Sequence, residues 1–264
     1  MLRSMYSGIG GMKSFQTKLD VIGNNIANVN TYGYKKGRTT FKDLVSQQIS
    51  GASAPTATKG GINPKQVGLG AQLATIDTIH TQGSLQTTAR PLDLAISGDG
   101  YFIVNDGAND FVTRAGNFYM DESGDLVNGN GLYVKVVGAD KANIPTEAKS
   151  FSIGADGTIT YILEGNSTPQ TAGQIALAKF ANNGGLEKVG DNLYQETTNS
   201  GTLSEFAPGT NGTGDIVAGA LEMSNVDLSE EFTEMIVAQR GFQANTRIIT
   251  TSDEILQELV NLKR

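Results

Sequence analysis

The chain offers few residues that could perform catalysis. His80 is its single histidine, and cysteine is absent. A histidine-based catalytic triad or a metal site of histidine and cysteine ligands needs several such side chains close together. We therefore predict no catalytic residue, no metal site and no bound cofactor, and we expect no enzymatic activity.

Aspartates are the remaining candidates for metal or acid–base chemistry. Asp99, Asp106, Asp110, Asp121 and Asp125 lie in turn-like stretches, and none fits the ligand spacing of an EF-hand loop. Aspartate is common in turns because its side chain bonds to nearby backbone groups, and we interpret these residues in that way. A pair of carboxylates for glycoside hydrolysis stays open, because a sequence does not show a cleft.

The charge pattern excludes several classes of function. Twenty-seven acidic and 20 basic residues give a net charge of −7, which argues against a nucleic-acid-binding protein. Lys35, Lys36 and Arg38 form a small basic cluster, which we expect to be solvated. The chain has no apolar run of the roughly 20 residues that a membrane span needs, and its N-terminus lacks the pattern of a cleavable signal peptide. We therefore expect no membrane insertion.

The strongest structural pattern lies in the last forty residues. Asp227 can cap a helix, and apolar residues then recur at every seventh position. A second line follows four residues after the first and contains polar residues. The first line is Leu228, Met235, Phe242, Ile249 and Leu256, and the second is Phe232, Gln239, Thr246, Asp253 and Val260.

A second amphipathic helix is predicted at the N-terminus, where apolar residues recur every three or four positions. They are Leu2, Met5, Ile9, Met12, Phe15, Leu19, Ile22, Ile26 and Val29. We expect the two terminal helices to pair. Their partners lie either within the monomer or on neighbouring subunits, and the polar second line favours neighbouring subunits.

The middle of the chain has the pattern of an antiparallel β domain. Asn-Gly and Asp-Gly turns separate short apolar runs, and 33 glycines favour turn-rich structure. Residues 46–68 are small and polar and indicate an extended or mobile linker. The candidate strands are residues 94–96, 101–104, 111–113, 117–120, 132–137, 151–153, 158–163, 175–180 and 216–223.

The predicted fold is α+β, with paired N- and C-terminal coiled-coil helices flanking a central, all-β, antiparallel domain. We expect residues 1–29 and 226–264 to form the helical domain, residues 30–72 an extended connector, and residues 73–225 the β domain.

Several stretches resemble one protein family. Residues 24–35 (NNIANVNTYGYK) are similar to the N-terminal signature of bacterial flagellar rod, hook and hook-associated proteins. Residues 91–96 (PLDLAI), 98–102 (GDGYF) and 111–118 (FVTRAGNF) resemble β-domain motifs of that family. The signature residues are Asn25, Asn28, Thr31, Gly33, Tyr34, Gln239 and Arg240.

The resemblance implies a structural axial subunit whose terminal helices line an inner tube. It implies that the following residues form the assembly interface: Leu2, Met5, Ile9, Met12, Phe15, Leu19, Ile22, Ile26, Leu228, Phe232, Met235, Phe242, Ile249 and Leu256. The subunit would polymerise with itself into an open helical filament outside the cytoplasmic membrane, after export through the flagellar export apparatus without a cleaved signal.

Within the family, two readings compete. Residues 235–245 (MIVAQRGFQAN) resemble the hook, a flexible torque-transmitting tube between rod and filament, and this is our first interpretation. The length of 264 residues is typical of distal rod subunits, which are the alternative. A mobile linker near residues 30–72 would let hook subunits slide past each other, whereas a stiff rod needs that linker locked.

The resemblance also implies contacts with distal rod, hook cap and hook–filament junction proteins. A more distant alternative is a secreted β-domain protein that binds or hydrolyses glycans and uses its helices to oligomerise.

Overall fold

The computed structural model describes residues 2–56, 58–165 and 168–262, which divide into two compact units. Residues up to 27, residues 37–77 and residues from 227 onward form the helical unit. Residues 28–36 and 78–226 form the β unit. The α+β fold is confirmed, with terminal helices and an antiparallel β region between them. The domain boundaries expected from the sequence stay predictions.

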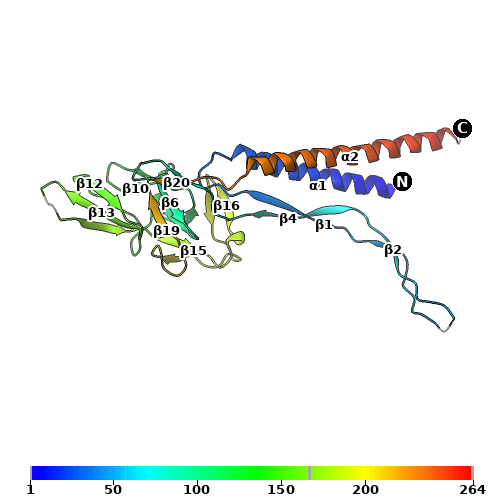
Figure 1. The fold of residues 1–264 in the computed structure, drawn as a ribbon, viewed down its shortest axis with the longest axis horizontal. Coiled ribbons are helices and arrows are strands. Elements are labelled where there is room, and N and C mark those ends of the chain that lie inside the picture. Colours follow the sequence, from blue (N-terminus) through cyan, green and yellow to red (C-terminus); the bar gives the residue numbers. More distant parts are fainter. Residues whose placement is uncertain (1, 57, 166–167, 263–264) are drawn as a thin grey trace. The chain divides into compact units, whose positions relative to one another are not determined.

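The helical unit contains the two terminal helices. Helix α1 spans Leu2–Ala27 and helix α2 spans Leu228–Asn261, and they lie side by side although they come from opposite ends of the chain (Figure 1). The Asp227 side chain accepts hydrogen bonds from the backbone N–H groups of Ser229 and Glu230, which confirms the predicted cap. In the part of the chain that the structure describes, no helix is long and apolar enough to cross a membrane.

Small residues let the two helices approach closely. A Cβ atom at Gly11 would lie 2.8 Å from Asn245 Nδ2, and one at Gly8 would lie 3.4 Å from Ile249 Cγ1. On α2, Ala238 and Ser252 are buried. These contacts leave no space for larger side chains at Gly8 and Gly11. At these positions, side chains of α2 pack directly against the backbone of α1.

The inward face of α2 differs from the predicted seam. Four of the five residues of the first line are correct in position, because Met235, Phe242, Ile249 and Leu256 are partly buried, whereas Leu228 is exposed. The line beside it consists of Glu231, Ala238, Asn245 and Ser252, three residues after the first line rather than four. Among the residues predicted for the second line, Phe232 and Val260 are 51% and 66% exposed, while the Thr246 hydroxyl lies 3.4 Å from the Met12 sulfur. The sequence misled us because these inward positions are small or polar rather than apolar.

Residues 37–77 add paired strands to the helical unit. Strand β1 (Gly37–Asp43) pairs with β4 (Ala71–Thr78), and β2 (Gln47–Ser50) pairs with β3 (Lys65–Val67) in an antiparallel hairpin. We did not predict this pairing, because the small and polar residues of the segment lack the alternating apolar pattern of a strand. The segment is therefore extended, as expected, but held by strand pairing.

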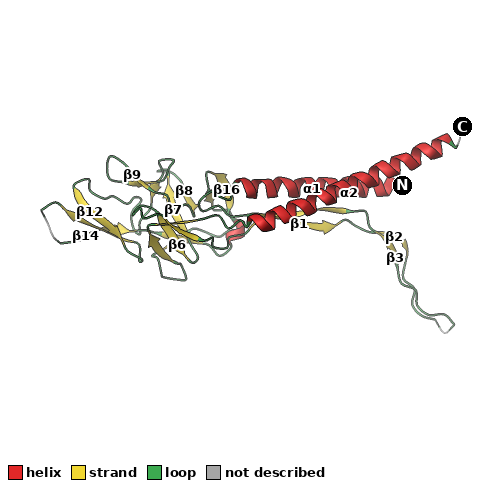
Figure 2. Cartoon of the chain, turned by 45° about the horizontal axis from the view of Figure 1, so that its top comes forward, coloured by secondary structure: helices red, strands yellow, loops and turns green. Residues whose placement is uncertain are grey.

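The β unit consists of antiparallel strands joined by tight turns (Figure 2). Its largest sheet has the order β16-β17-β8-β7-β11-β10-β9, with β15 joining β7 to β18. Further sheets are β12-β13-β14, β19-β6 and β20-β5. The strand bounds are β5 Leu85–Thr87, β6 Leu94–Ser97, β7 Tyr101–Asn105, β8 Asp110–Thr113, β9 Tyr119–Met120, β10 Leu126–Val127, β11 Tyr133–Val134, β12 Ala148–Ile153, β13 Thr158–Leu163, β14 Gln170–Gln174, β15 Leu177–Lys179, β16 Glu187–Gly190, β17 Leu193–Gln195, β18 Ser204–Phe206, β19 Asp215–Ala218 and β20 Ala220–Glu222. A short 3₁₀ helix spans Asn183–Gly185.

Apolar residues from many of these strands form the core of the β unit. Leu94, Phe102, Phe118 and Ile175 are fully buried within it. The predicted apolar runs all contain observed strands, whereas β5, β10, β14, β16, β17 and β18 of the β unit were missed. Strand β10 has only two residues, and the other missed strands carry polar or charged residues, so their sequences give little periodicity.

We predict that Gly241→Ala destabilises the helical unit. A Cβ atom there would lie 2.5 Å from Phe15 Cζ, and the aromatic ring cannot yield without disturbing the packing of α1 on α2. Overpacking costs about 1–3 kcal/mol and outweighs the gain in helix propensity of about 1 kcal/mol. Urea unfolding of the full chain, followed by circular dichroism, measures the difference.

Gly23→Ala is the matched control, because apart from the neighbouring backbone of α1 no described atom lies within 4 Å of the added Cβ. It should stabilise the chain by about 0.5–1 kcal/mol through helix propensity alone. If Gly241→Ala were as stabilising as this control, the close contact with Phe15 would be refuted.

Candidate functional site

The first signature residue, Asn25, joins three elements of the helical unit. Its side chain is buried in α1, donates to the Gly37 carbonyl oxygen (2.9 Å) and the Glu231 carboxylate (3.1 Å), and accepts from the Gly37 N–H (2.9 Å). It thereby connects α1 to the start of β1 and to the first turns of α2. A buried amide needs such partners for both its donor and its acceptor.

Gly33 marks the tight turn of the signature segment, residues 28–36, in the β unit. Its φ angle is +68°, and a Cβ atom would lie 2.5 Å from the Ala115 backbone nitrogen. Its N–H donates to the Glu222 carbonyl oxygen over 2.8 Å. Any side chain at this position would be strained by the positive φ angle and would clash with the backbone of Ala115, so glycine is required here.

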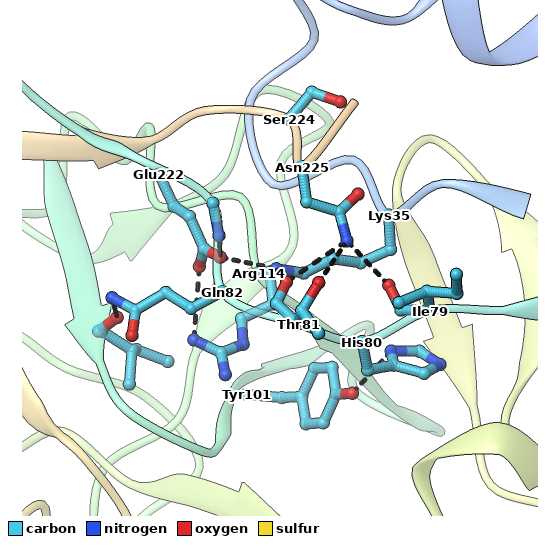
Figure 3. A network of polar contacts seen from close by, with 12 residues as sticks. Lys35, Ile79, His80, Thr81, Gln82, Tyr101, Arg114, Glu222, Ser224 and Asn225 are labelled. Atoms are coloured by element: carbon cyan, nitrogen blue, oxygen red, sulfur yellow. Dashed lines mark hydrogen bonds and ion pairs between the residues drawn. The ribbon is translucent and has the colours of Figure 1, made fainter. Parts of the chain in front are cut away.

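A buried ionic network follows directly after this turn (Figure 3). The Lys35 ammonium donates to Glu222 Oε1 (2.5 Å) and to the Thr81 carbonyl oxygen (2.8 Å). The Arg114 guanidinium donates to Glu222 Oε2 (3.2 Å) and to the Gly98 carbonyl oxygen (2.7 Å). The three charged side chains are at most 3% exposed. Our expectation that Lys35 is solvated is wrong, because a carboxylate 187 positions later in the chain neutralises it.

Asn225 adds a second tie to the same segment (Figure 3). Its side chain accepts from the Lys36 N–H (2.8 Å) and donates to the Ile79 carbonyl oxygen (2.8 Å). Lys188 also reaches the segment, because its ammonium donates to the Lys35 carbonyl oxygen (3.3 Å). The signature segment is thus held by residues from widely separated parts of the β unit.

Burial controls the electrostatics of this network. It lowers the pKa of Lys35, and the neighbouring Glu222 carboxylate opposes that shift. It also lowers the pKa of His80 to about 4, with further lowering by the cations of Lys35, Lys188 and Arg114. His80 is therefore neutral at pH 7.

Tyr101 completes this arrangement as the hydrogen-bond partner of His80. Burial raises the pKa of its phenol above the ordinary range, so it stays protonated. Its hydroxyl forms a hydrogen bond of 2.8 Å with His80 Nδ1 (Figure 3). The contact with the buried phenol holds the neutral imidazole in a defined position.

The described residues contain no group of three or more histidine, cysteine or acidic side chains that could hold a metal ion. One predicted turn residue, Asp125, proves to be buried, where its carboxylate accepts from Lys141 (2.7 Å) and Asn143 (2.6 Å). These two hydrogen bonds connect the backbone around Asp125 to the segment that contains Lys141 and Asn143.

The remaining signature residues occupy different places. Thr31 bonds to the Asn28 side chain (3.1 Å), and Tyr34 is buried beneath the Lys188 ammonium. Gln239 and Arg240 lie on the exposed surface of α2. Thr31 and Tyr34 belong to the β unit, whereas Gln239 and Arg240 belong to the helical unit.

The residues expected at the assembly interface lie on α1 and α2. Ile22 is buried between the elements of the helical unit, whereas Ile9, Leu228 and Phe232 are 39%, 39% and 51% exposed. Met5, Met12, Phe15, Leu19, Ile26, Met235, Phe242, Ile249 and Leu256 are partly buried. The side chain of Leu2 lies outside the described part of the structure.

Sequence reasoning missed Glu222, Glu231, Arg114 and Asn225. Glu222 carried a weak signal, because it is an acid in the otherwise apolar run of residues 220–223. A lone charge in an apolar strand indicates a buried partner of opposite charge, although not which one. Asn225 and Glu231 carry no such signal.

The sequence matches family models along much of its length. Residues 5–35 match "Flagella basal body rod protein", residues 95–161 match "Flagellar hook protein FlgE/F/G D1 domain", and residues 217–262 match "Flagellar basal body rod FlgEFG protein C-terminal".

Curated relatives cover the whole chain. The flagellar basal-body rod protein FlgG of Bacillus subtilis is 62% identical over 265 residues, which include all of both proteins. FlgG of Buchnera aphidicola is 39% identical over 99% of this chain and all of the relative. The flagellar hook protein FlgE of Borreliella burgdorferi is 33% identical, in an alignment of 441 residues that covers all of both proteins.

We predict that Glu222→Gln strongly destabilises the β unit. The substitution leaves the Lys35 and Arg114 cations buried without a carboxylate, which costs about 3–5 kcal/mol. Glu205→Gln is the matched control, because Glu205 is 32% exposed and its partner Lys135 keeps Asp110. The control should lose no more than about 1 kcal/mol in urea unfolding. Equal losses in the two variants would refute the special role of the network.

We predict an acid-sensitive contribution from His80. Its folded-state pKa of about 4 lies below the ordinary value of 6.5, so the unfolded chain takes up a proton between these values and the folded chain does not. Stability from this group is complete above pH 6.5 and decreases as the pH falls to about 4, by about 2 kcal/mol after allowance for partial solvent exposure.

The measurement compares unfolding free energies of the wild type and His80→Gln from pH 4 to pH 7. The difference between the two proteins should change across this range, which separates His80 from the titrating carboxylates. A constant difference would show that the pKa of His80 is the same in the folded and the unfolded chain, which would contradict the prediction.

Proposed function

The chain belongs to the flagellar rod and hook protein family, and we propose that within this family it is a distal rod subunit. The protein is thus a structural, non-enzymatic component of the bacterial flagellum, located outside the cytoplasmic membrane. The observation that carries the proposal is the 62% identity to a basal-body rod protein over the full length of both chains.

The comparison with hook proteins supports the same choice. The hook relative is 33% identical, and its alignment extends over 441 positions against 265 for the rod relative. A large part of that hook protein therefore has no counterpart in this chain. Our first interpretation, the hook, rested on residues 235–245, and the distal rod was its alternative. The full-length comparison favours the alternative.

The pairing of strands in the connector, residues 30–72, supports the assignment to the rod on mechanical grounds. A flexible hook requires a connector that lets subunits slide, whereas a rod requires a rigid one. Strands β1 and β4 pair, and the Leu44 N–H donates to the Gly70 carbonyl oxygen over 2.8 Å. The hairpin of β2 and β3 continues the pairing. A connector held by backbone hydrogen bonds suits a stiff shaft.

The outer surface of α2 supports polymerisation through the helices. Val237, Ile248, Ile255 and Leu259 are 43–56% exposed and follow one another at intervals of eleven, seven and four residues, which places them on one side of α2. An exposed apolar stripe of this kind is typical of a surface that another protein covers, because burial removes its apolar area from water. We assign it, with the exposed members of the predicted interface, Ile9, Leu228 and Phe232, to contacts with neighbouring subunits of an open helical polymer.

The family implies polymerisation together with other axial proteins. The specific neighbours remain part of the proposal: hook subunits would follow this protein in the axial structure, and the flagellar export apparatus would deliver it. Direct contacts with hook cap and hook–filament junction proteins are expected for a hook rather than for a distal rod.

Electron microscopy of flagellar basal bodies tests the proposal. Cells that lack this protein should have basal bodies without the distal part of the rod and should be non-motile. The wild-type protein should restore straight rods, and a gold-labelled copy should locate to the rod. Labelled protein in a curved, flexible tube outside the envelope would instead establish a hook subunit.

A further inference from the structure

A polar cavity of about 530 Å³ opens on the β unit beside the signature segment. It lies where this segment meets the turn between β10 and β11 and the turn between β16 and β17. Asparagine side chains dominate its lining, and we call it the asparagine pocket. They are Asn28, Asn30, Asn117, Asn128, Asn130 and Asn192.

Hydrogen bonds within the protein fix the walls of this pocket. Asn128 Oδ1 accepts from the backbone N–H groups of Asn130 and Leu132, at 2.9 Å each. Asn192 Nδ2 donates to the Tyr32 carbonyl oxygen over 3.2 Å. The backbone carbonyl oxygen of Asn192 accepts from the Thr113 hydroxyl over 2.9 Å. A cavity with fixed walls can bind a ligand without first losing conformational entropy.

Amide groups remain available to a ligand. Among the residues that the structure describes, Asn128 Nδ2 and Asn192 Oδ1 have no protein partner, and neither do the side chains of Asn30 and Asn130. Each amide carries an acceptor and a donor group side by side. A pair of neighbouring hydroxyl groups, each able to donate and to accept, is complementary to this arrangement.

The charge of the pocket narrows the choice of ligand. In the described lining, Asp191 is the charged residue, and lysine, arginine and histidine are absent. An anionic ligand such as a phosphate or a nucleic acid would therefore lack a cation to bind. A largely apolar ligand would leave the amides without hydrogen bonds.

An aromatic residue adds an apolar surface to this lining. Tyr32 contributes to the pocket and is 36% exposed. An aromatic ring can pack against the C–H groups of a sugar ring while nearby polar groups bond to its hydroxyls. Amides, a carboxylate and an aromatic ring together are suited to a neutral, polyhydroxylated molecule.

From these features we infer that the asparagine pocket binds a segment of a neutral carbohydrate chain. The amides pair with hydroxyl or acetamido groups of the sugar, and Tyr32 packs on a sugar ring. This activity is binding without bond cleavage. It does not depend on whether the subunit belongs to the rod or the hook.

The experiment measures binding of chitotetraose and cellotetraose to the purified full chain by saturation-transfer NMR and calorimetry. We expect saturable binding of at least one of them at concentrations of about 1 mM or below. Asn30→Ala and Asn130→Ala each remove an exposed amide that makes no structural hydrogen bond, and each should weaken binding about tenfold.

Asn109→Ala is the matched control, since Asn109 is exposed and lies outside the pocket. This variant should bind as the wild type does, and unchanged circular dichroism in all variants excludes misfolding. The inference is overturned if neither oligosaccharide binds at about 10 mM. It is also overturned if binding survives both pocket substitutions, or if these substitutions reduce self-association while no sugar binds, because the pocket would then receive a second copy of the chain.

Discussion

The close approach of the two terminal helices is the constraint on which the helical unit depends. Each helix has an apolar face whose exposure to water is unfavourable, and each has small residues at the points of contact. Gly8 and Gly11 on α1 face Ile249 and Asn245 on α2, while Gly241 faces Phe15. Because these contacts are specific in position, the helices are fixed in one register rather than free to slide. A register fixed in the monomer allows identical subunits to present the same surface to each other.

Polar groups fix the chain immediately after α1. Asn25 acts in the helical unit, where it bonds to Gly37 and Glu231. Lys35 acts in the β unit, where it bonds to Glu222 and Thr81. Both side chains are buried, and burial makes an unpaired polar group costly. The buried signature residues are therefore best understood as a set of contacts that hold the backbone around a tight turn, rather than as a reactive motif.

The elements with regular patterns could be predicted from the sequence. The helices followed from apolar spacing and the Asp227 cap, and strands such as β6 and β7 followed from apolar runs between Gly and Asp turns. The buried ionic network could not be predicted, because Lys35 looks like a solvated cation until Glu222 is known to lie beside it. The inward face of α2 was also missed. Asn245 and Ser252 face inward because small or polar side chains fit the narrow space there, and an apolar pattern does not reveal such positions.

The pairing of the first helix with the last has a consequence for the order of folding. Lys18 forms an ion pair with Glu234, which lies 216 positions further along the chain. Contacts of such high sequence separation form late, because the whole intervening chain must be present and its ends must meet. A chain that emerges gradually can complete the β unit while α1 still lacks its partner. The helical unit then closes only when the C-terminal segment arrives, so a truncated chain would leave the apolar face of α1 uncovered.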